Sequence, residues 1–208
     1  MLSSFSNIVL TGFMGTGKTE VGKRLAQLLE MDLIDTDIAI EAKVGLTIPE
    51  IFHRSNPEEL SRCVRRVPRL PEYGERRFRE EETAVIRQVA AEHGCVIATG
   101  GGAVLNPENV QLLREKGVII LLTAQPAVIA ARVIKSGGRP LLQGDDPHGD
   151  LELRIRDLLA AREPYYQDCD YQIDTTELSV EEVAAKIISL LDGRREPGGG
   201  WKIGNTTG

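Results

Sequence analysis

The sequence GFMGTGKT at residues 12–19 decides the fold of this chain. A glycine is followed by four residues and then by Gly-Lys-Thr, which is the pattern of a phosphate-binding loop. Residues 7–11 before it (Asn-Ile-Val-Leu-Thr) are typical of a short buried strand, and residues 18–29 after it have the apolar spacing of a helix. Because this motif requires a strand before it and a helix after it, the sequence predicts a phosphate site here.

The residue types in the loop suit a nucleoside triphosphate. Gly12, Gly15 and Gly17 leave backbone N–H groups open to phosphate oxygens, and the start of the following helix adds partial positive charge. Lys18 is placed to reach the β- and γ-phosphates, and the Thr19 hydroxyl to bind Mg²⁺. Kinases, GTPases and ATP-driven switches share this loop, and a glycine-rich turn without a ligand is the alternative.

The composition fits an ordinary globular protein. The 208 residues are 41% hydrophobic and 27% charged, and the length suits one domain with a full core. A formal net charge of −6 does not favour nucleic acid as a partner. An odd number of cysteines without metal-ligand spacing predicts reduced thiols in the cytoplasm: Cys63, Cys95 and Cys169. The first residues contain no basic region or long apolar run, so we expect no secretion signal and no membrane span.

Predicted strands and helices alternate along the chain. Further strands are expected at residues 32–36, 95–99, 117–122 and 171–174. Helices are expected at residues 38–52 in two pieces broken at Gly45, and at 74–93, from 107, 125–135, 150–164 and from 180. The fold class is therefore α/β, a five-stranded parallel sheet with helices on both faces. The phosphate site belongs at the carboxyl edge, between the first and third strands.

Two carboxylates separated by one residue end the second predicted strand. Asp35 and Asp37 share a face of an extended segment, at the edge where such sheets bind ligands. Asp35 is then placed to hold Mg²⁺ through water, and Asp37 to meet a substrate hydroxyl. The alternative is that an aspartate caps the helix that follows, because Asp is a preferred N-cap residue.

Arginines gather in the first turns of the predicted helix 74–93. Arg76, Arg77 and Arg79 lie there against a helix dipole that disfavours cations. An anionic ligand would relieve this repulsion. The acids at residues 80–82 would do so equally well, leaving only a solvated charged face.

Glycines mark two further loops. Residues 100–102 are three glycines after the third strand, and they allow backbone to approach a ligand closely or form a flexible turn. Residues 136–149 form a long glycine- and proline-rich loop with Arg139 near its start, and such loops often act as lids.

Taken together, these motifs resemble the shikimate kinase family, within the nucleoside-monophosphate-kinase-like group. The resemblance covers residues 7 to about 191, and its motifs occur in the family's order. Beyond the phosphate loop, the matching stretches are Asp35-Thr36-Asp37, Gly74-Glu75 with Phe78-Arg79, Gly100-Gly101-Gly102, Arg139-Pro140-Leu141-Leu142 and Arg162-Glu163-Pro164-Tyr165-Tyr166.

The resemblance implies transfer of the ATP γ-phosphoryl group to the 3-hydroxyl of shikimate, in the chorismate pathway of aromatic amino-acid biosynthesis. It implies that Asp37 binds that hydroxyl as a base or positioning group. Arg79 and Arg162 would clamp the shikimate carboxylate, since guanidinium groups suit carboxylates. Gly101 and Gly102 would offer backbone contacts to the ring substituents.

The same resemblance implies which residues bind ATP and Mg²⁺. Arg139 would close with the lid at residues 137–149 onto the phosphates, and Arg132 matches the position that stacks on adenine. Mg²⁺ would be held by Thr19 and Asp35. The residues that would bind ATP are Gly12, Gly15, Thr16, Gly17, Lys18, Thr19, Arg132 and Arg139; those that would act in catalysis are Lys18, Asp37 and Arg139.

Two stretches depart from the family pattern. Residues 53–72 interrupt its short link before Gly74, and Asn56-Pro57 with the spacing of the apolar residues after it predicts an inserted helix at 57–67. The loop at residues 174–178 contains no arginine or aromatic residue to hold adenine.

Several expectations stay open at this stage. Another small-metabolite kinase, such as a gluconate or nucleotide kinase, is an alternative, as is an inactive homologue whose insertion serves a partner. A GTPase switch would need an Asn-Lys-x-Asp motif, which the sequence lacks. We expect a cytoplasmic monomer with one kinase domain at residues 1–192, a disordered tail at 193–208, and neither nucleic acid nor membrane as a partner.

Overall fold

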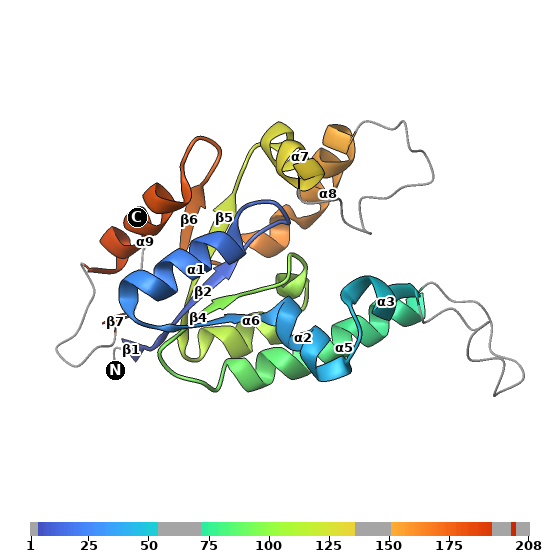
Figure 1. Ribbon diagram of the computed structural model, residues 1–208, viewed down its shortest axis with the longest axis horizontal. Helices are drawn as coiled ribbons and strands as arrows, with labels where there is room; N and C mark the ends of the chain where they lie inside the picture. Colours follow the sequence, from blue (N-terminus) through green and yellow to red (C-terminus); the bar gives the residue numbers. More distant parts are fainter. Residues whose placement is uncertain (1–3, 54–71, 136–150, 193–200, 203–208) are drawn as a thin grey trace, which may run out of the picture.

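The computed structural model describes residues 4–53, 72–135, 151–192 and 201–202 (Figure 1). Its main sheet has five parallel strands in the order β3-β4-β2-β5-β6. These strands are β2 (Asn7–Thr11), β3 (Asp32–Asp35), β4 (Cys95–Ala98), β5 (Gly117–Thr123) and β6 (Tyr171–Asp174). The predicted α/β class and the five parallel strands are confirmed, and β2 and β4 are neighbours, as the predicted site between the first and third strands requires.

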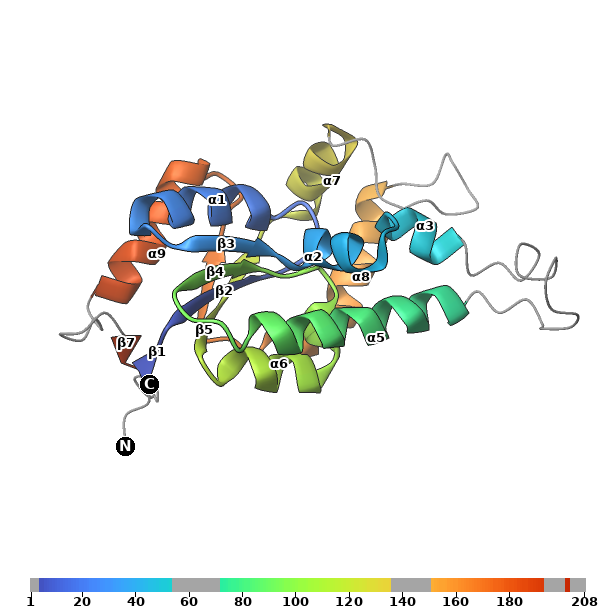
Figure 2. The same cartoon turned by 60° about the horizontal axis from the view of Figure 1, so that its bottom comes forward.

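Helices cover both faces of the sheet (Figure 2). On one face lie α1 (Lys18–Leu29) and α9 (Val180–Asp192), and on the other α5 (Glu72–Val89) and α6 (Pro107–Arg114). The strands supply both cores, because alternate side chains point to opposite faces. Ile8 and Leu10 belong to the core under α1 and α9, whereas Val9 between them belongs to the core under α5 and α6.

The remaining elements lie around the carboxyl edge of the strands. They are α2 (Thr36–Val44), α3 (Ile48–His53), the 3₁₀ helix η1 (Ala103–Leu105), α7 (Pro126–Lys135) and α8 (Leu151–Tyr166). Gly45 separates α2 from α3 with φ +72, which explains the break predicted there. A third core cluster joins Phe13 of the phosphate loop to Ile129, Val133 and Ile155 of α7 and α8.

The structure shifts several predicted boundaries; for example, α5 spans Glu72–Val89 instead of residues 74–93. Thr36 begins α2 instead of ending β3, and α8 continues past Pro164 to Tyr166. A proline usually ends a helix because it lacks an N–H donor. Here only the last turn is affected, and that turn is anchored by the buried Tyr166, whose hydroxyl donates to the Gly101 carbonyl at 3.0 Å.

The chain ends meet in a second, two-stranded sheet. Strand β1 (Ser4–Phe5) pairs antiparallel with β7 (Trp201–Lys202). At residues 201–202 the structure therefore differs from the predicted disordered tail, because pairing with a distant strand is a non-local effect that composition does not report. The rest of the tail lies outside the described residues, and a domain boundary at residue 192 stays a prediction.

Other predictions also fall outside the described residues. They are the inserted helix 57–67, most of the insertion 53–72, and the lid 137–149 with Arg139. On either side of the insertion, α3 and α5 pack together, and the Phe52 and Phe78 rings lie 5.2 Å apart. In the part of the chain that the structure describes, no helix has the length and apolar character needed to cross a membrane.

Candidate active site

A pocket of about 500 Å³ lies at the carboxyl edge of the sheet. It is lined by the phosphate loop, the β3–α2 junction, the glycines after β4 and parts of α1, α3, α5, α7, α8 and α9. The predicted site residues that line it are Gly15, Thr16, Gly17, Lys18, Thr19, Asp35, Asp37, Arg79, Gly101, Gly102, Arg132 and Arg162. One cavity thus brings together residues that the sequence separates by more than a hundred positions.

The phosphate loop contains three glycines with positive φ. Gly12, Gly15 and Gly17 have φ of 136, 78 and 95, a region that glycine adopts readily. A Cβ at Gly12 would lie 2.1 Å from the Leu122 carbonyl oxygen, so no other residue fits there. Gly12 itself contributes through its carbonyl, which accepts a hydrogen bond from Lys18 Nζ at 2.9 Å.

Lys18 is held inside the loop. Its Nζ also donates to the Phe13 carbonyl at 2.9 Å, and the residue is only 8% exposed. Carbonyl oxygens offset part of the cost of burying an ammonium group. The cation is therefore kept at the start of α1, where backbone N–H groups and the helix dipole also favour an anion.

Asp35 caps the helix that follows it, as one sequence interpretation predicted, and the same side chain lines the pocket. Its Oδ1 accepts hydrogen bonds from the backbone N–H groups of Asp37 and Ile38, so it is the N-cap of α2. Its Oδ2 accepts a hydrogen bond from the Thr19 hydroxyl at 2.8 Å. A hydroxyl and a carboxylate oxygen are hard donors that suit Mg²⁺. No cluster of three or more His, Cys, Asp or Glu occurs among the described residues, so waters and phosphates would complete the coordination, as is usual for Mg²⁺.

The glycine triplet lies against the acidic and basic groups of the pocket. The Gly100 N–H donates to the buried Thr36 hydroxyl at 2.9 Å, which ties the triplet to the Asp-Thr-Asp segment. A Cβ at Gly100 would lie 2.6 Å from Asp37 Oδ1, and one at Gly102 would lie 2.7 Å from both terminal nitrogens of Arg79. A side chain at Gly100 or Gly102 would therefore displace Asp37 or Arg79, which favours the interpretation of close approach over that of a flexible turn.

Arg79 is fixed by carboxylates of its own helix. Its Nη1 donates to Glu82 at 2.7 Å, its Nη2 donates to Glu75 at 3.3 Å, and its guanidinium lies 5.2 Å from the centre of the Phe78 ring. Burial by itself would lower the pKa of Arg79, but the two carboxylates outweigh burial and raise it. Arg79 is thus neutralised by neighbouring acids, as one alternative predicted, and it also lines the pocket.

Glu82 is a site residue that the sequence analysis did not single out. It is 1% exposed, its Oε2 accepts from Arg79, and its Oε1 has no hydrogen-bond partner among the described residues. Burial raises the pKa of Glu82, and Arg79 acts in the opposite direction. Helical spacing in the sequence could have identified Glu82 as a buried residue. Glu82 lies four residues after Phe78 and three before Val85, on the apolar stripe of α5.

Arg162 reaches the pocket from α8. Its Nη1 donates to the Gly101 carbonyl at 3.4 Å, and its guanidinium lies 5.3 Å from the centre of the Phe13 ring. The same carbonyl accepts from Tyr166. Burial raises the pKa of the Tyr166 hydroxyl, so it remains a donor. The two arginines predicted to clamp a carboxylate therefore line one pocket, from different helices.

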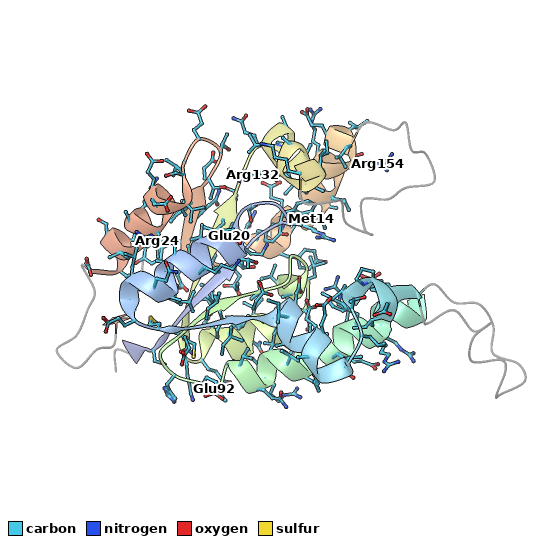
Figure 3. All side chains as sticks on the ribbon, in the orientation of Figure 1. Met14, Glu20, Arg24, Glu92, Arg132 and Arg154 are labelled. Carbon is cyan, nitrogen blue, oxygen red and sulfur yellow. The ribbon has the colours of Figure 1, made fainter. Side chains whose placement is uncertain are left out.

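Arg132 lies on the other side of the pocket, near Met14 and Glu20 (Figure 3). Its Nη1 donates to the Thr175 hydroxyl at 3.0 Å and to the Gly15 carbonyl at 3.3 Å, and its Nη2 donates to the Thr175 carbonyl at 2.8 Å. Thr175 is 2% exposed and donates in turn to the Thr16 carbonyl at 3.1 Å. The loop after β6 therefore orients Arg132 against the phosphate loop.

Aliphatic side chains complete this side of the pocket. The sequence analysis found no arginine or aromatic residue in the loop after β6 to hold a base. The structure instead places four apolar side chains along the pocket near α1 and α9: Val21, Leu178, Val180 and Val183. Their position at the pocket is not predicted from the sequence, because helical spacing marks Val21 and Val183 as core residues and does not show which core residues border a cavity.

Comparisons with known proteins agree with this geometry. The sequence pattern of the family described as "Shikimate kinase" matches residues 14–66 and 61–192, and the two matches overlap at residues 61–66, within the predicted insertion. The chain is 46% identical over 182 residues to the shikimate kinase of Caldanaerobacter subterraneus subsp. tengcongensis, covering 88% of this chain and 94% of that protein. It is 45% identical over 185 residues to the shikimate kinase of Pelotomaculum thermopropionicum, covering 89% and 95%.

Solved structures show the same relationship. Shikimate kinase from Acinetobacter baumannii in complex with shikimate superposes with a TM-score of 0.75 at 35% identity, covering 89% of this chain and 92% of that one. Shikimate kinase from Bacteroides thetaiotaomicron gives a TM-score of 0.74 at 30% identity, covering 90% and 98%. The chain belongs to the shikimate kinase family.

Proposed function

We propose that this protein is a shikimate kinase, which transfers the γ-phosphoryl group of ATP to the 3-hydroxyl of shikimate. The products are shikimate 3-phosphate and ADP, in the pathway to aromatic amino acids. The observation that carries the proposal is that one pocket holds a phosphate loop, a carboxylate and two arginines that approach from different helices. Family membership supports the choice of shikimate as the acceptor.

The phosphate half of the site has the groups that phosphoryl transfer needs. This reaction depends on positioning and charge neutralisation more than on covalent chemistry. The loop N–H groups and Lys18 would hold the β- and γ-phosphates. Mg²⁺, held by Thr19 and through water by Asp35, would neutralise charge on the phosphates when bound. The hydrogen bond between Thr19 and Asp35 supports this pairing, since it already places both oxygens together.

The acceptor half suits a hydroxylated carboxylic acid. Asp37 would accept a hydrogen bond from the 3-hydroxyl and orient it toward the γ-phosphate, as a base or positioning group. Arg79 and Arg162 would bind the carboxylate, because guanidinium N–H groups pair well with carboxylate oxygens. The backbone of Gly101 and Gly102 would contact the ring substituents. Phe52, Phe78 and Ile48 give this end of the pocket apolar walls for the face of the ring.

The remaining assignments rest on the family pattern. Arg132 would stack on adenine opposite the aliphatic side chains near α9, and Arg139 would approach the phosphates with the lid. A cytoplasmic monomer without nucleic-acid or membrane partners is the state that we propose for the enzyme. A gluconate-type kinase is the second candidate, because its substrate is also a hydroxylated acid, but no further observation favours it.

An acceptor comparison tests the proposal. Release of ADP would be measured in a coupled assay with ATP and Mg²⁺, using shikimate, gluconate, AMP or no acceptor. Of the acceptors tested, we expect only shikimate to support turnover. We also expect this turnover to be lost when EDTA removes the metal. Folded protein that releases no ADP in response to shikimate would contradict the proposed function, and faster turnover with gluconate would favour the second candidate.

A further inference from the structure

Phe13 connects the two halves of the pocket. Its backbone carbonyl accepts hydrogen bonds from Lys18 Nζ at 2.9 Å and from the Thr16 hydroxyl at 2.8 Å. Its side chain is 1% exposed and packs with Ile129 of α7 and with other apolar residues of α7 and α8. The guanidinium of Arg162 lies over the same ring, 5.3 Å from its centre. One residue thus supports the phosphate-binding lysine through its backbone and an acceptor-side arginine through its ring.

The two arginines of the acceptor half are held in different ways. Both lie over a phenyl ring, Arg79 over Phe78 and Arg162 over Phe13. Arg79 is also fixed by the carboxylates of Glu75 and Glu82. Within the described residues, no carboxylate lies within ion-pair distance of Arg162. Its orientation depends on the Gly101 carbonyl at 3.4 Å, on Tyr166 and on the Phe13 ring.

An aromatic face has a particular advantage for a ligand-binding arginine. The ring attracts the guanidinium through its quadrupole and uses none of its N–H donors. A carboxylate partner would compete with an anionic substrate for those donors, whereas a ring leaves most of them available. Burial of Phe13 in a packed cluster also keeps its ring in one orientation.

We infer that Phe13 is a positioning residue for shikimate binding, which acts through Arg162. The inference rests on the proposed function, in which Arg162 binds the shikimate carboxylate. It assigns a second task to a loop residue whose backbone serves ATP. Loss of the ring should weaken shikimate binding and leave ATP binding almost unchanged, because the carbonyl that supports Lys18 is retained in every variant.

The variant Phe13→Leu removes the aromatic face and keeps an apolar side chain in the cluster. Steady-state kinetics would give the KM for shikimate and for ATP separately. We expect the KM for shikimate to rise about 5- to 30-fold, the equivalent of about 1–2 kcal/mol for a shielded cation–π contact. The KM for ATP should change less than about twofold. The control Ile155→Val loosens the same cluster without changing the ring, and it should alter neither KM by more than about twofold.

A double-mutant cycle separates positioning from general loss of packing. If Phe13 acts through Arg162, then Phe13→Leu should have no further effect on the shikimate KM once Arg162→Ala has been introduced. Thermal melting of all four proteins would verify that each is folded. The inference is overturned if Phe13→Leu leaves the shikimate KM unchanged, if its effect persists in the Arg162→Ala background, or if Arg162→Ala itself has no effect.

Calorimetric titration of shikimate gives the same comparison without turnover. The proposed function and this inference can therefore fail separately. A protein that binds shikimate in a manner dependent on Phe13 but does not phosphorylate it would refute only the proposed function. A protein that phosphorylates shikimate with the same affinity in the Phe13→Leu variant would refute only the role of Phe13.

Discussion

Replacing Glu82 by Gln should weaken shikimate binding with little loss of stability. Two effects oppose each other at this residue. Its ion pair with Arg79 stabilises the charged carboxylate, and its burial, at 1% exposure, destabilises the same charge. The pKa of Glu82 is raised above its ordinary value: burial is the largest cause, and burial together with repulsion from Asp37 and Glu75 outweighs the attraction of Arg79. A neutral side chain of the same shape therefore avoids a cost that the folded protein now carries.

The expected magnitudes follow from this balance. Breaking a buried pair by removing one partner usually costs about 3–5 kcal/mol. Here Gln keeps an oxygen for Arg79 Nη1, and Arg79 keeps Glu75, so the free energy of unfolding at pH 7 should fall by less than about 1 kcal/mol. The KM for shikimate should still rise about tenfold, or about 1.4 kcal/mol, because Arg79 loses its shorter and better buried ion pair.

The pH dependence has a definite sign. The pKa of Glu82 is higher in the folded protein than in the unfolded chain, so proton binding stabilises the folded state. This stabilisation is fully present at pH values below the pKa in the unfolded chain, and it is lost as the pH rises through the pKa in the folded protein. Gln cannot titrate, so the variant does not lose this stabilisation. The free energy of unfolding of Glu82→Gln minus that of the unmodified protein should therefore become more positive as the pH increases. Urea denaturation at pH 5 and pH 7 would measure this difference.

Glu75→Gln is the matched control, since it removes the exposed acidic partner of the same arginine. It should raise the shikimate KM less than Glu82→Gln does, because the shorter and better buried ion pair of Arg79 with Glu82 is kept. The reasoning is refuted if Glu82→Gln loses more than about 2 kcal/mol at pH 7, because the attraction of Arg79 would then exceed the cost of burial. An unchanged shikimate KM would refute the claim that Glu82 orients Arg79.

Three further predictions concern other parts of the pocket. Asp37→Asn should lower kcat about 100-fold or more in steady-state assays and change KM little, because the carboxylate orients or deprotonates the acceptor hydroxyl; a kcat within threefold would argue against this role. Gly102→Ala should raise the KM for shikimate and spare that for ATP, since its Cβ would lie 2.7 Å from the Arg79 nitrogens; equal changes in both constants would indicate a general distortion. Deletion of residues 53–72 should change kcat less than about tenfold, a barrier change under about 1.4 kcal/mol, and loss of all activity in a protein that still melts cooperatively would place the insertion in the site.

The sequence predicts those parts of the fold that depend on local signals. The strands β2 and β6 and the helix α1 have the predicted bounds, because turn residues and apolar periodicity mark both of their ends. The predicted end of α8 at Pro164 is wrong, because the helix continues to Tyr166. The effect of a proline in the last turn depends on how that turn is anchored, here by the hydrogen bond of Tyr166. The pairing of β1 with β7 joins the two ends of the chain, and local composition contains no sign of it.

The same distinction holds for the site. Clear motifs identify the glycines and charged residues of the site, and the structure brings all of the described ones except Gly12 to the lining of one pocket. Glu82 was passed over as one of three consecutive acids, although it lies on the apolar stripe of α5. Thr175 has an unremarkable sequence context, and its importance comes from hydrogen bonds to Thr16, which is 159 residues away in the chain. Such contacts follow from topology, which the motifs alone do not specify.

The glycines at residues 100–102 explain why the acceptor half can depend on so many elements. The triplet contacts Asp37 of α2, Arg79 of α5 and Arg162 of α8, and its middle residue lies close to the Met14 N–H in the phosphate loop. The approaches of Asp37, Arg79 and the phosphate loop are this close because the triplet has no side chains. A shift of this turn would therefore move three proposed acceptor-binding groups relative to the phosphates at once. The geometry of the proposed transfer would therefore depend on a turn whose backbone is held by the buried Thr36 hydroxyl, which accepts a hydrogen bond from the Gly100 N–H.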